Sequence, residues 1–271
     1  MDKNFYSVYV SAFNLIQNEF DYKYHVDNFC EFVGDSGDVT ICCNSSIDNT
    51  LEELKNLTKK YKNLNIIESA ESYDNPGLDG ILKNIALQAT KNPIKLSFDM
   101  DEAINLNLKD SIDSISEYFL NSNYQAAMLP VINIIGDKYH YKDINFKWRI
   151  HKQGLFRGVV NFARQNDGTH SIELSDGCEL ISADGNLVSS VYLIDPSLDD
   201  NKKLWEITNN NIPWIWHYGL LDFEKKAARN RNFWAEHWKV ESGREVEVEL
   251  SVQDFENKYN GTAKLHNLPI E

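Results

Sequence analysis

Two aspartates, Asp99 and Asp101, are the residues of this chain whose types and spacing most directly suggest chemistry. They follow an apolar alternation that predicts a strand over 94–98. Carboxylates at positions i and i+2 project to the same side of an extended chain, and two carboxylates can hold a hard divalent cation that bridges a diphosphate. In a chain rich in aspartate, a solvated turn or a helix N-cap is the alternative origin of such a pair.

Two common phosphate-binding motifs are absent from the sequence. It contains no G-x-x-x-x-G-K-[ST], which excludes a P-loop, and no G-x-G-x-x-G follows the first predicted strand, which excludes a dinucleotide fingerprint. A nucleotide would therefore have to be held in another way. A divalent cation bound by Asp99 and Asp101 is one such way.

Strand-like and helix-like patterns alternate along the first half of the chain, and these elements must position the aspartates. The patterns predict strands over 7–12, 39–43, 65–68, 94–98 and 126–135, the last one buried, and helices that begin at Thr50 and after Gly77. Such a series with short connections predicts an α/β fold, a doubly wound and mostly parallel sheet with helices on both faces.

Local signals define the two predicted helices. Thr50 and Glu53 form a capping box, so Thr50 is expected to cap the first helix with its side chain. The second helix is expected to bury one stripe of its surface, which comprises Ile81, Leu82, Ile85 and Ala89.

Ligands of doubly wound sheets bind beyond the carboxyl ends of the strands. We therefore expect Ala12–Asn14, Cys43–Asn44 and Asp99–Asp101 to gather at one edge of the sheet. The second half of the chain is less regular and holds all six tryptophans; its patterns predict mixed strands followed by a charged helix over about 222–238. No repeat or obvious linker divides the sequence, so a single domain over 1–271 is expected.

Three segments, in order, resemble the family-two glycosyltransferases. Residues 41–54 are similar to the second-strand segment, where Ser46, Asp48 and Thr50 match positions of the family's Ser-x-Asp-Gly-Thr turn. Residues 80–102 are similar to the helix with an internal asparagine, here Asn84, and to the strand that ends in D-x-D. The Asp-x-Asp-Glu ending is similar to the branch that modifies bacterial surface saccharides.

This resemblance covers about the first 110 residues and implies the GT-A fold. It also implies sugar transfer, with inversion, from a nucleotide-diphosphate sugar to a saccharide or lipid-linked saccharide in surface polysaccharide synthesis. About 1–120 would bind the nucleotide sugar and about 121–271 the acceptor.

The resemblance implies roles only where positions match. It places Ala12, Phe13 and Asn14 beside the nucleoside, Asp99 near the ribose, and Asp101 on a Mn²⁺ or Mg²⁺ ion. Asp48 and Asn84 either touch the nucleotide or brace the local turn. Where the family has an aspartate that reads the base, this chain has Cys43; the amide of Asn44 is the candidate substitute.

The second half should supply the catalytic base, because an inverting transfer needs a carboxylate that takes the proton of the acceptor hydroxyl. Glu173, Asp176 and Glu179 are candidates. We select Asp176, although Asp176-Gly177 also fits an ordinary hairpin turn.

Three further residues of the second half are candidates for the site. Arg149 and Arg157 could hold the diphosphate or an acidic acceptor, or form a salt-bridged sheet surface. His217 resembles the late histidine that some GT-A enzymes place on the metal; a satisfied core histidine is the alternative.

The composition of the chain limits the classes of partner that it is expected to bind. With 41 acidic and 27 basic residues the net charge is -14, which argues against nucleic acid. The sequence shows neither a signal-peptide pattern nor an apolar stretch long enough to span a bilayer, so a cytoplasmic location is expected. The basic run over 225–231 could contact an anionic membrane that carries a lipid-linked acceptor, or be a solvated helix face.

Two other classes of protein remain as alternatives. A sugar nucleotidyltransferase shares the sheet and the metal chemistry, but it should carry a Gly-rich loop with Lys or Arg after the first strand, which residues 12–18 lack. A non-catalytic carbohydrate-binding protein on the same fold is the second alternative, and Cys43 in the base-reading position favours it.

Overall fold

Strands and helices alternate along the first half of the chain. The computed structural model describes residues 6–44, 48–72, 78–152, 155–158, 178–181, 190–222, 225 and 266–267. In chain order these begin with β1 (Tyr6–Ala12), α1 (Tyr22–Val33), β2 (Asp38–Asn44), α2 (Thr50–Leu57), β3 (Leu64–Ser69), α3 (Leu78–Ala89) and β4 (Ile94–Phe98). The first four predicted strands are confirmed, and α1 is an element that the patterns did not predict.

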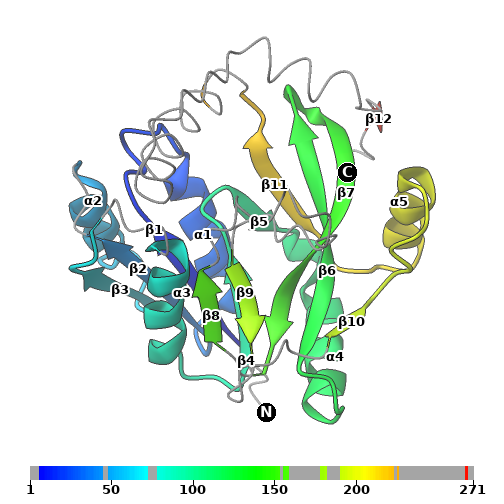
Figure 1. Cartoon of the computed structure of the whole chain (residues 1–271), viewed down its shortest axis with the longest axis horizontal. Coiled ribbons are helices and arrows are strands. Elements are labelled where there is room, and N and C mark those ends of the chain that lie inside the picture. The colour runs from blue at the N-terminus through cyan, green and yellow to red at the C-terminus, as the bar shows by residue number, and fades with distance from the viewer. Residues whose placement is uncertain are drawn as a thin grey trace, which may run out of the picture.

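The four strands pair in parallel in the order β3-β2-β1-β4 (Figure 1). Ala12 lies opposite Cys43, and Val10 lies opposite Phe98, so the three strands end at the same edge of the sheet. This register confirms that the segments following β1, β2 and β4 gather there.

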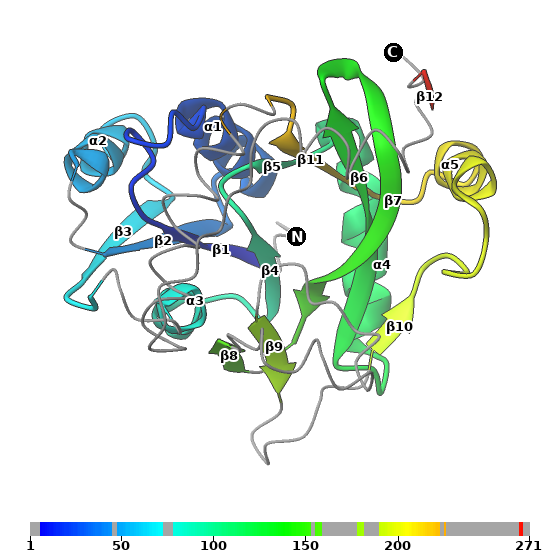
Figure 2. The same cartoon turned by 45° about the horizontal axis from the view of Figure 1, so that its top comes forward.

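Helices cover both faces of these strands because successive side chains of β1 point to opposite faces. Val8 and Val10 pack in one apolar cluster with Phe29 of α1 and Leu54 of α2. Tyr9 packs on the other face with Leu82 of α3. Figure 2 shows α1 and α3 on opposite sides of β1. The predicted doubly wound α/β sheet is confirmed.

The second half extends this sheet with mixed pairing. Its described elements are β5 (Glu102–Ile104), the short helix η1 (Leu106–Leu108), α4 (Lys109–Leu120), β6 (Ala126–Ile135), β7 (Asp137–His151), β10 (Ser190–Tyr192), α5 (Asp200–Asn209), β11 (Ile215–Leu220) and β12 (His266–Asn267), with β8 (Leu155–Gly158) and β9 (Cys178–Ile181) as a separate pair. β7 runs antiparallel to β4 and β6, and β11 runs parallel to β6 and antiparallel to β5. All ten residues of β6 are buried, as predicted.

The predicted capping box is wrong. Asn49 is the N-cap of α2, and no side chain caps this helix. The hydroxyl of Thr50 instead accepts hydrogen bonds from the backbone N–H groups of Leu15 and Ile16, at 2.8 and 3.3 Å. Glu53 accepts from Tyr22, which lies on α1. The Thr50 hydroxyl oxygen, which the capping box would use to accept from its own helix, thus accepts from a loop that is distant in sequence.

The buried face of α3 also differs from the prediction. Leu82 is buried, but Ile81 and Ile85 are only partly covered, and the remaining buried positions are Leu78, Gly80, Lys83, Ala86 and Leu87. Lys83 is fully buried because two carboxylates neutralise its ammonium group. A charged residue thus shares the buried face of the helix.

Of the predicted charged helix over 222–238, only residues 222 and 225 lie within the described part.

Among the helices that the structure describes, none combines the length and the apolar character that a bilayer span needs.

Candidate functional site

Asp101 and His217 lie together beyond the carboxyl end of β4. The antiparallel pairing of β11 with β5 puts His217 opposite Glu102, and the backbone N–H of Tyr218 donates to the carbonyl oxygen of Asp101 at 2.8 Å. His217 Nε2 is then 3.5 Å from Asp101 Oδ2. Their side chains are 16% and 14% exposed, so the pair sits in a partly dry environment with access from solvent.

The two aspartates point to different partners, and the expectation that they project to the same side is wrong. The backbone N–H of Glu102 donates to the carbonyl oxygen of Asp99 at 3.1 Å, which closes a turn. Side chains at i and i+2 share a side only in extended chain, and residues 100–101 are in this turn. Asp101 therefore faces His217, while Asp99 faces a group of cations.

Asp99, whose side chain is 22% exposed, is the centre of an ion cluster whose other members are buried. Its Oδ1 is 2.8 Å from Lys83 Nζ, and its Oδ2 is 3.2 Å from Lys147 Nζ and 2.9 Å from Arg149 Nη2. Glu102 completes the cluster, with Oε1 at 3.1 Å from the Lys147 ammonium and 2.7 Å from the Arg149 guanidinium. Burial alone would raise the pKa of Asp99, but the positive charges of Lys83, Arg149 and Lys147 outweigh it and hold the pKa well below its usual value.

Arg149 is placed as a structural cation. Its side chain is 1% exposed and bonds both Asp99 and Glu102. A guanidinium in this position neutralises the carboxylates beneath the turn and does not reach a diphosphate in the solvent. The salt-bridged alternative from the sequence fits this geometry, although the pair is buried and not on the surface.

Gly219 borders the Asp101–His217 pair. A Cβ atom at this position would lie 2.6 Å from His217 Nε2 and 2.8 Å from Asp101 Oδ2, closer than real Cβ contacts come. The absence of a side chain therefore allows the backbone of β11 to pass this close to both polar atoms.

A small aromatic group, formed by Tyr24, His25 and Tyr218, lies near Asp101. His25 is buried, and its Nδ1 lies 2.7 Å from the carbonyl oxygen of Glu102. The Tyr218 ring packs against His25 and against Tyr24, with ring centroids 5.7 and 6.0 Å away. Burial lowers the pKa of His25, and the charge of Asp101 partly opposes this. No motif marks these residues in the sequence, and only the position of β11 brings Tyr218 to the two residues of α1.

The residues expected beside the nucleoside lie at the same edge but are mostly covered. Ala12, Asn14 and Asn44 are buried, whereas Phe13 and Asn84 are half-buried. A fully buried Asn44 presents no open amide to a base in this structure.

Asp48 braces the neighbouring loop. Its Oδ2 accepts from the backbone N–H of Gln17 at 2.8 Å, and its Oδ1 accepts from that of Thr50 at 2.9 Å. Of the two roles left open for Asp48, the bracing role is the one that these bonds support.

Several predicted residues lie outside the described part of the chain. Asp176 and Glu173 are among them, so the choice of catalytic base stays a prediction. Arg157 lies on β8 and Glu179 on β9, and the structure describes only the backbone of both strands.

Within the described residues, no group of three or more His, Cys, Asp or Glu side chains could hold a metal ion. Asp101 and His217 are therefore a two-residue candidate, and a cation there would need further oxygen ligands from a phosphate or from water.

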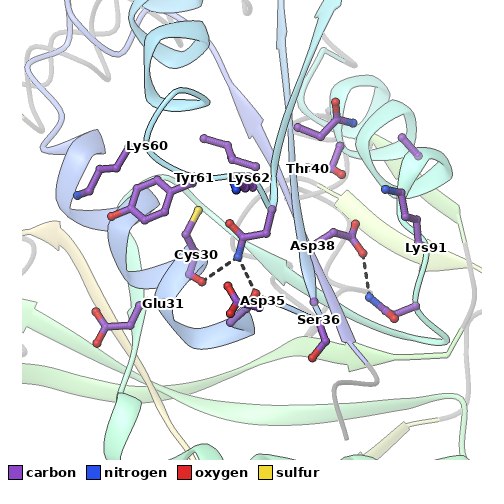
Figure 3. Close-up of a pocket in the computed structure, with 17 residues that line it drawn as sticks. Cys30, Glu31, Asp35, Ser36, Asp38, Thr40, Lys60, Tyr61, Lys62 and Lys91 are labelled. Carbon is purple, nitrogen blue, oxygen red and sulfur yellow. Dashed lines mark hydrogen bonds between the residues drawn. The ribbon is translucent and has the colours of Figure 1, made fainter. Parts of the chain in front are cut away.

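A groove of about 940 Å³ lies at the opposite edge of the sheet, at the amino ends of β2 and β3 (Figure 3). Some of its polar groups have partners within the protein: Asp38 Oδ1 accepts from Ser7 and Asn92, and Lys60 pairs with Asp27 at 2.8 Å. Ligands of such sheets bind at the carboxyl edge, where the Asp101–His217 pair lies, so we place the candidate site there and not in this groove.

Known proteins resemble this chain in structure and not in sequence. No protein-family model and no curated protein sequence matches it. A crystal structure of S. aureus TarS 1–349 has a TM-score of 0.41 and 16% identity, covering 95% of this chain and 79% of that one. The mannosyltransferase PcManGT from Pyrobaculum calidifontis, in complex with GDP-Man and Mn²⁺, has a TM-score of 0.38 and 17% identity over 46% of this chain and 35% of its own.

A third solved structure belongs to a different class of enzyme. The 4-diphosphocytidyl-2C-methyl-D-erythritol synthase from Anaerococcus prevotii has a TM-score of 0.31 and 13% identity, covering 55% of this chain and 64% of that one. With every TM-score here below 0.5, these likenesses carry no argument about activity, and the function must be argued from the residues.

Proposed function

We propose that this chain is a GT-A glycosyltransferase in which Asp101 and His217 hold a Mn²⁺ or Mg²⁺ ion. It would move a sugar, with inversion, from a nucleotide-diphosphate sugar to a saccharide or lipid-linked saccharide. The observation that carries the proposal is the 3.5 Å approach of His217 Nε2 to Asp101 Oδ2 at the carboxyl edge of parallel strands. Ligands of such sheets bind at this edge.

The residues present fit a divalent cation. A carboxylate oxygen and an imidazole nitrogen are both ligands of Mn²⁺, and Gly219 passes close to both without a side chain that would collide with them. An ion held by few protein side chains keeps coordination positions for phosphate oxygens. When bound, such a cation offsets the negative charge that develops on a departing nucleoside diphosphate.

The chain's own residues have two further tasks in this proposal. The cations around Asp99 hold the turn that presents Asp101, and the loop after β1, braced by Asp48 and Thr50, forms the nucleoside side of the site. Asp176 is the proposed base that takes the proton of the acceptor hydroxyl.

The test is ligand binding by the Asp101→Asn variant. Thermal shift is measured with a panel of nucleoside diphosphates, with and without Mn²⁺, and Mn²⁺ affinity is measured by electron paramagnetic resonance. For the wild type we expect a nucleoside diphosphate to raise the melting temperature only when Mn²⁺ is present, because a ligand that binds the folded state stabilises it. In Asp101→Asn, Mn²⁺ affinity should fall at least about 10-fold, as for the loss of a ligating group.

Asp27→Asn is the matched control, since this partly exposed carboxylate pairs with exposed Lys60. It should bind Mn²⁺ like the wild type. Undiminished Mn²⁺-dependent binding in Asp101→Asn contradicts the proposed site. A shift with nucleoside triphosphates but not with diphosphates would favour a nucleotidyltransferase.

A further inference from the structure

Asn133 is a buried amide in a strand that is otherwise apolar. It lies on β6, is 6% exposed, and stands opposite His217 in the parallel register of β6 with β11. On its other side the β6–β7 hairpin brings Asp143 close. One buried side chain thus lies between a carboxylate and the candidate metal-binding histidine.

Its two hydrogen bonds form a chain from Asp143 to His217. Asn133 Nδ2 donates to Asp143 Oδ1 at 2.5 Å, and Asn133 Oδ1 lies 2.6 Å from His217 Nδ1. An ionised carboxylate can only accept, so the amide nitrogen must face Asp143 and the amide oxygen must face the imidazole. That oxygen can only accept in turn, and Nδ1 must therefore carry the proton.

The direction of this chain decides which nitrogen of His217 is free to bind a cation. In a neutral imidazole one nitrogen donates and the other accepts, so a proton on Nδ1 leaves the lone pair on Nε2. Nε2 is the nitrogen that lies 3.5 Å from Asp101 Oδ2. Histidine ligands of metals commonly have their other nitrogen held in this way by an outer partner.

We propose that Asn133, oriented by Asp143, is a positioning residue that holds His217 as the Nδ1–H tautomer with Nε2 directed at the cation site of Asp101. The metal role of Nε2 rests on the proposed function. The tautomer itself does not, because it follows from hydrogen bonds of the metal-free protein.

The first experiment reads the tautomer directly. Long-range ¹H–¹⁵N NMR of the metal-free protein distinguishes Nδ1–H from Nε2–H imidazoles, and the spectrum of His217→Gln identifies the His217 signals among the seven histidines. We expect Nδ1–H in the wild type and a shift toward Nε2–H in Asn133→Leu, which keeps the size but removes the acceptor. Asn121→Leu is the control, since Asn121 is exposed after α4 and its amide donates to the carbonyl oxygen of Glu117; it should leave the tautomer unchanged.

The second experiment measures Mn²⁺ affinity by electron paramagnetic resonance. Asn133→Leu should bind Mn²⁺ about 10- to 100-fold more weakly, the usual loss when an outer partner of a metal ligand is removed. Asn133→Asp alone sets two carboxylates against each other and should also weaken binding. The double variant Asn133→Asp/Asp143→Asn should restore it, because the new carboxylate accepts from both His217 Nδ1 and the new amide.

The outcomes separate the two proposals. An Nε2–H tautomer in the wild type, or wild-type Mn²⁺ affinity in Asn133→Leu, overturns the positioning role. A wild-type Nδ1–H tautomer that shifts in Asn133→Leu, without any Mn²⁺ binding, supports the orientation of His217 by Asn133 and contradicts the metal site. Should Asn133→Leu fail to fold, the wild-type tautomer and the double variant still decide the question.

Discussion

Gly219 is important at the candidate site because it has no Cβ atom. Its backbone passes so close to the Asp101–His217 pair that a single methyl group would touch both polar side chains. Unlike Gly136, which has a φ of +70°, Gly219 is not a left-handed residue. The reason for glycine here is therefore space and not backbone conformation.

Gly219→Ala should close the candidate cation site. The added Cβ would lie within 2.8 Å of Asp101 Oδ2 and 2.6 Å of His217 Nε2, so one of these side chains must move. We expect Mn²⁺ affinity to fall at least about 10-fold, as for a displaced ligand, in a protein that still folds. Isothermal titration calorimetry with Mn²⁺ measures the loss.

Gly136→Ala is the control, and we expect it to lower stability without changing Mn²⁺ binding. A Cβ at Gly136 meets no atom within 4 Å, but its φ of +70° is unfavourable for alanine. Stability should fall by about 1 kcal/mol, while Mn²⁺ binding stays unchanged. Unaltered Mn²⁺ binding in Gly219→Ala would remove the space argument for the site.

The loop between β1 and α1 owes its conformation to the start of α2. Thr50 accepts from the N–H groups of Leu15 and Ile16, and Asp48 accepts from that of Gln17. Asn14, at φ 47°, is in the left-handed region where the loop begins. These bonds join two connections at the same edge of the sheet and prepare the surface proposed for the nucleoside.

Thr50→Val should loosen this loop without unfolding the chain. The variant keeps the shape of the side chain but leaves the buried N–H of Leu15 without its acceptor, at a cost of about 1–3 kcal/mol. Urea denaturation measures the change in stability. Thr58→Val is the control, because the Thr58 hydroxyl donates only to its own helix, at Lys55; equal effects of the two variants would argue against the anchoring role.

At the scale of the whole molecule, the Asp99 cluster joins the two halves of the chain. Lys83 comes from α3, Asp99 follows β4, Glu102 begins β5, and Lys147 and Arg149 lie on β7. β4 and β7 are also neighbours in the sheet. The described parts of the proposed donor half and acceptor half thus share one sheet and one ion cluster.

Asp99→Asn should destabilise the whole fold. Removing one partner of a buried ion cluster leaves its cations uncompensated, at a cost of about 3–5 kcal/mol. Because the folded pKa of Asp99 lies below its unfolded value of 3.8, the wild type gains this stability above that pH and loses it as the pH falls through the folded pKa. The difference between wild type and variant should therefore be large at neutral pH and shrink in strong acid.

Urea denaturation across this pH range provides the measurement. Asp27→Asn, which breaks a surface pair with Lys60, is the control and should change stability little at any pH. A constant difference between Asp99→Asn and wild type from neutral to strongly acidic pH would contradict the assigned charge of Asp99.

The sequence by itself determined most strands of the first half and the edge of the sheet where the site lies. Strand and helix periodicities are local, so four parallel strands, the buried strand over 126–135 and the position of Asp99 and Asp101 after β4 could all be predicted. Even the polar residue in β6 was visible as an interruption of an apolar run, although nothing local linked it to a histidine far along the chain.

Only the tertiary structure decided what the polar side chains do. The pairing of β11 with β5 and β6 places His217 beside Asp101 and Asn133, and the pairing of β7 with β4 places Arg149 beneath Asp99. Hydrogen bonds between distant residues also replaced the expected cap of Thr50. Side-chain partners depend on which strands become neighbours, and that is a property of the packed sheet and not of any single segment.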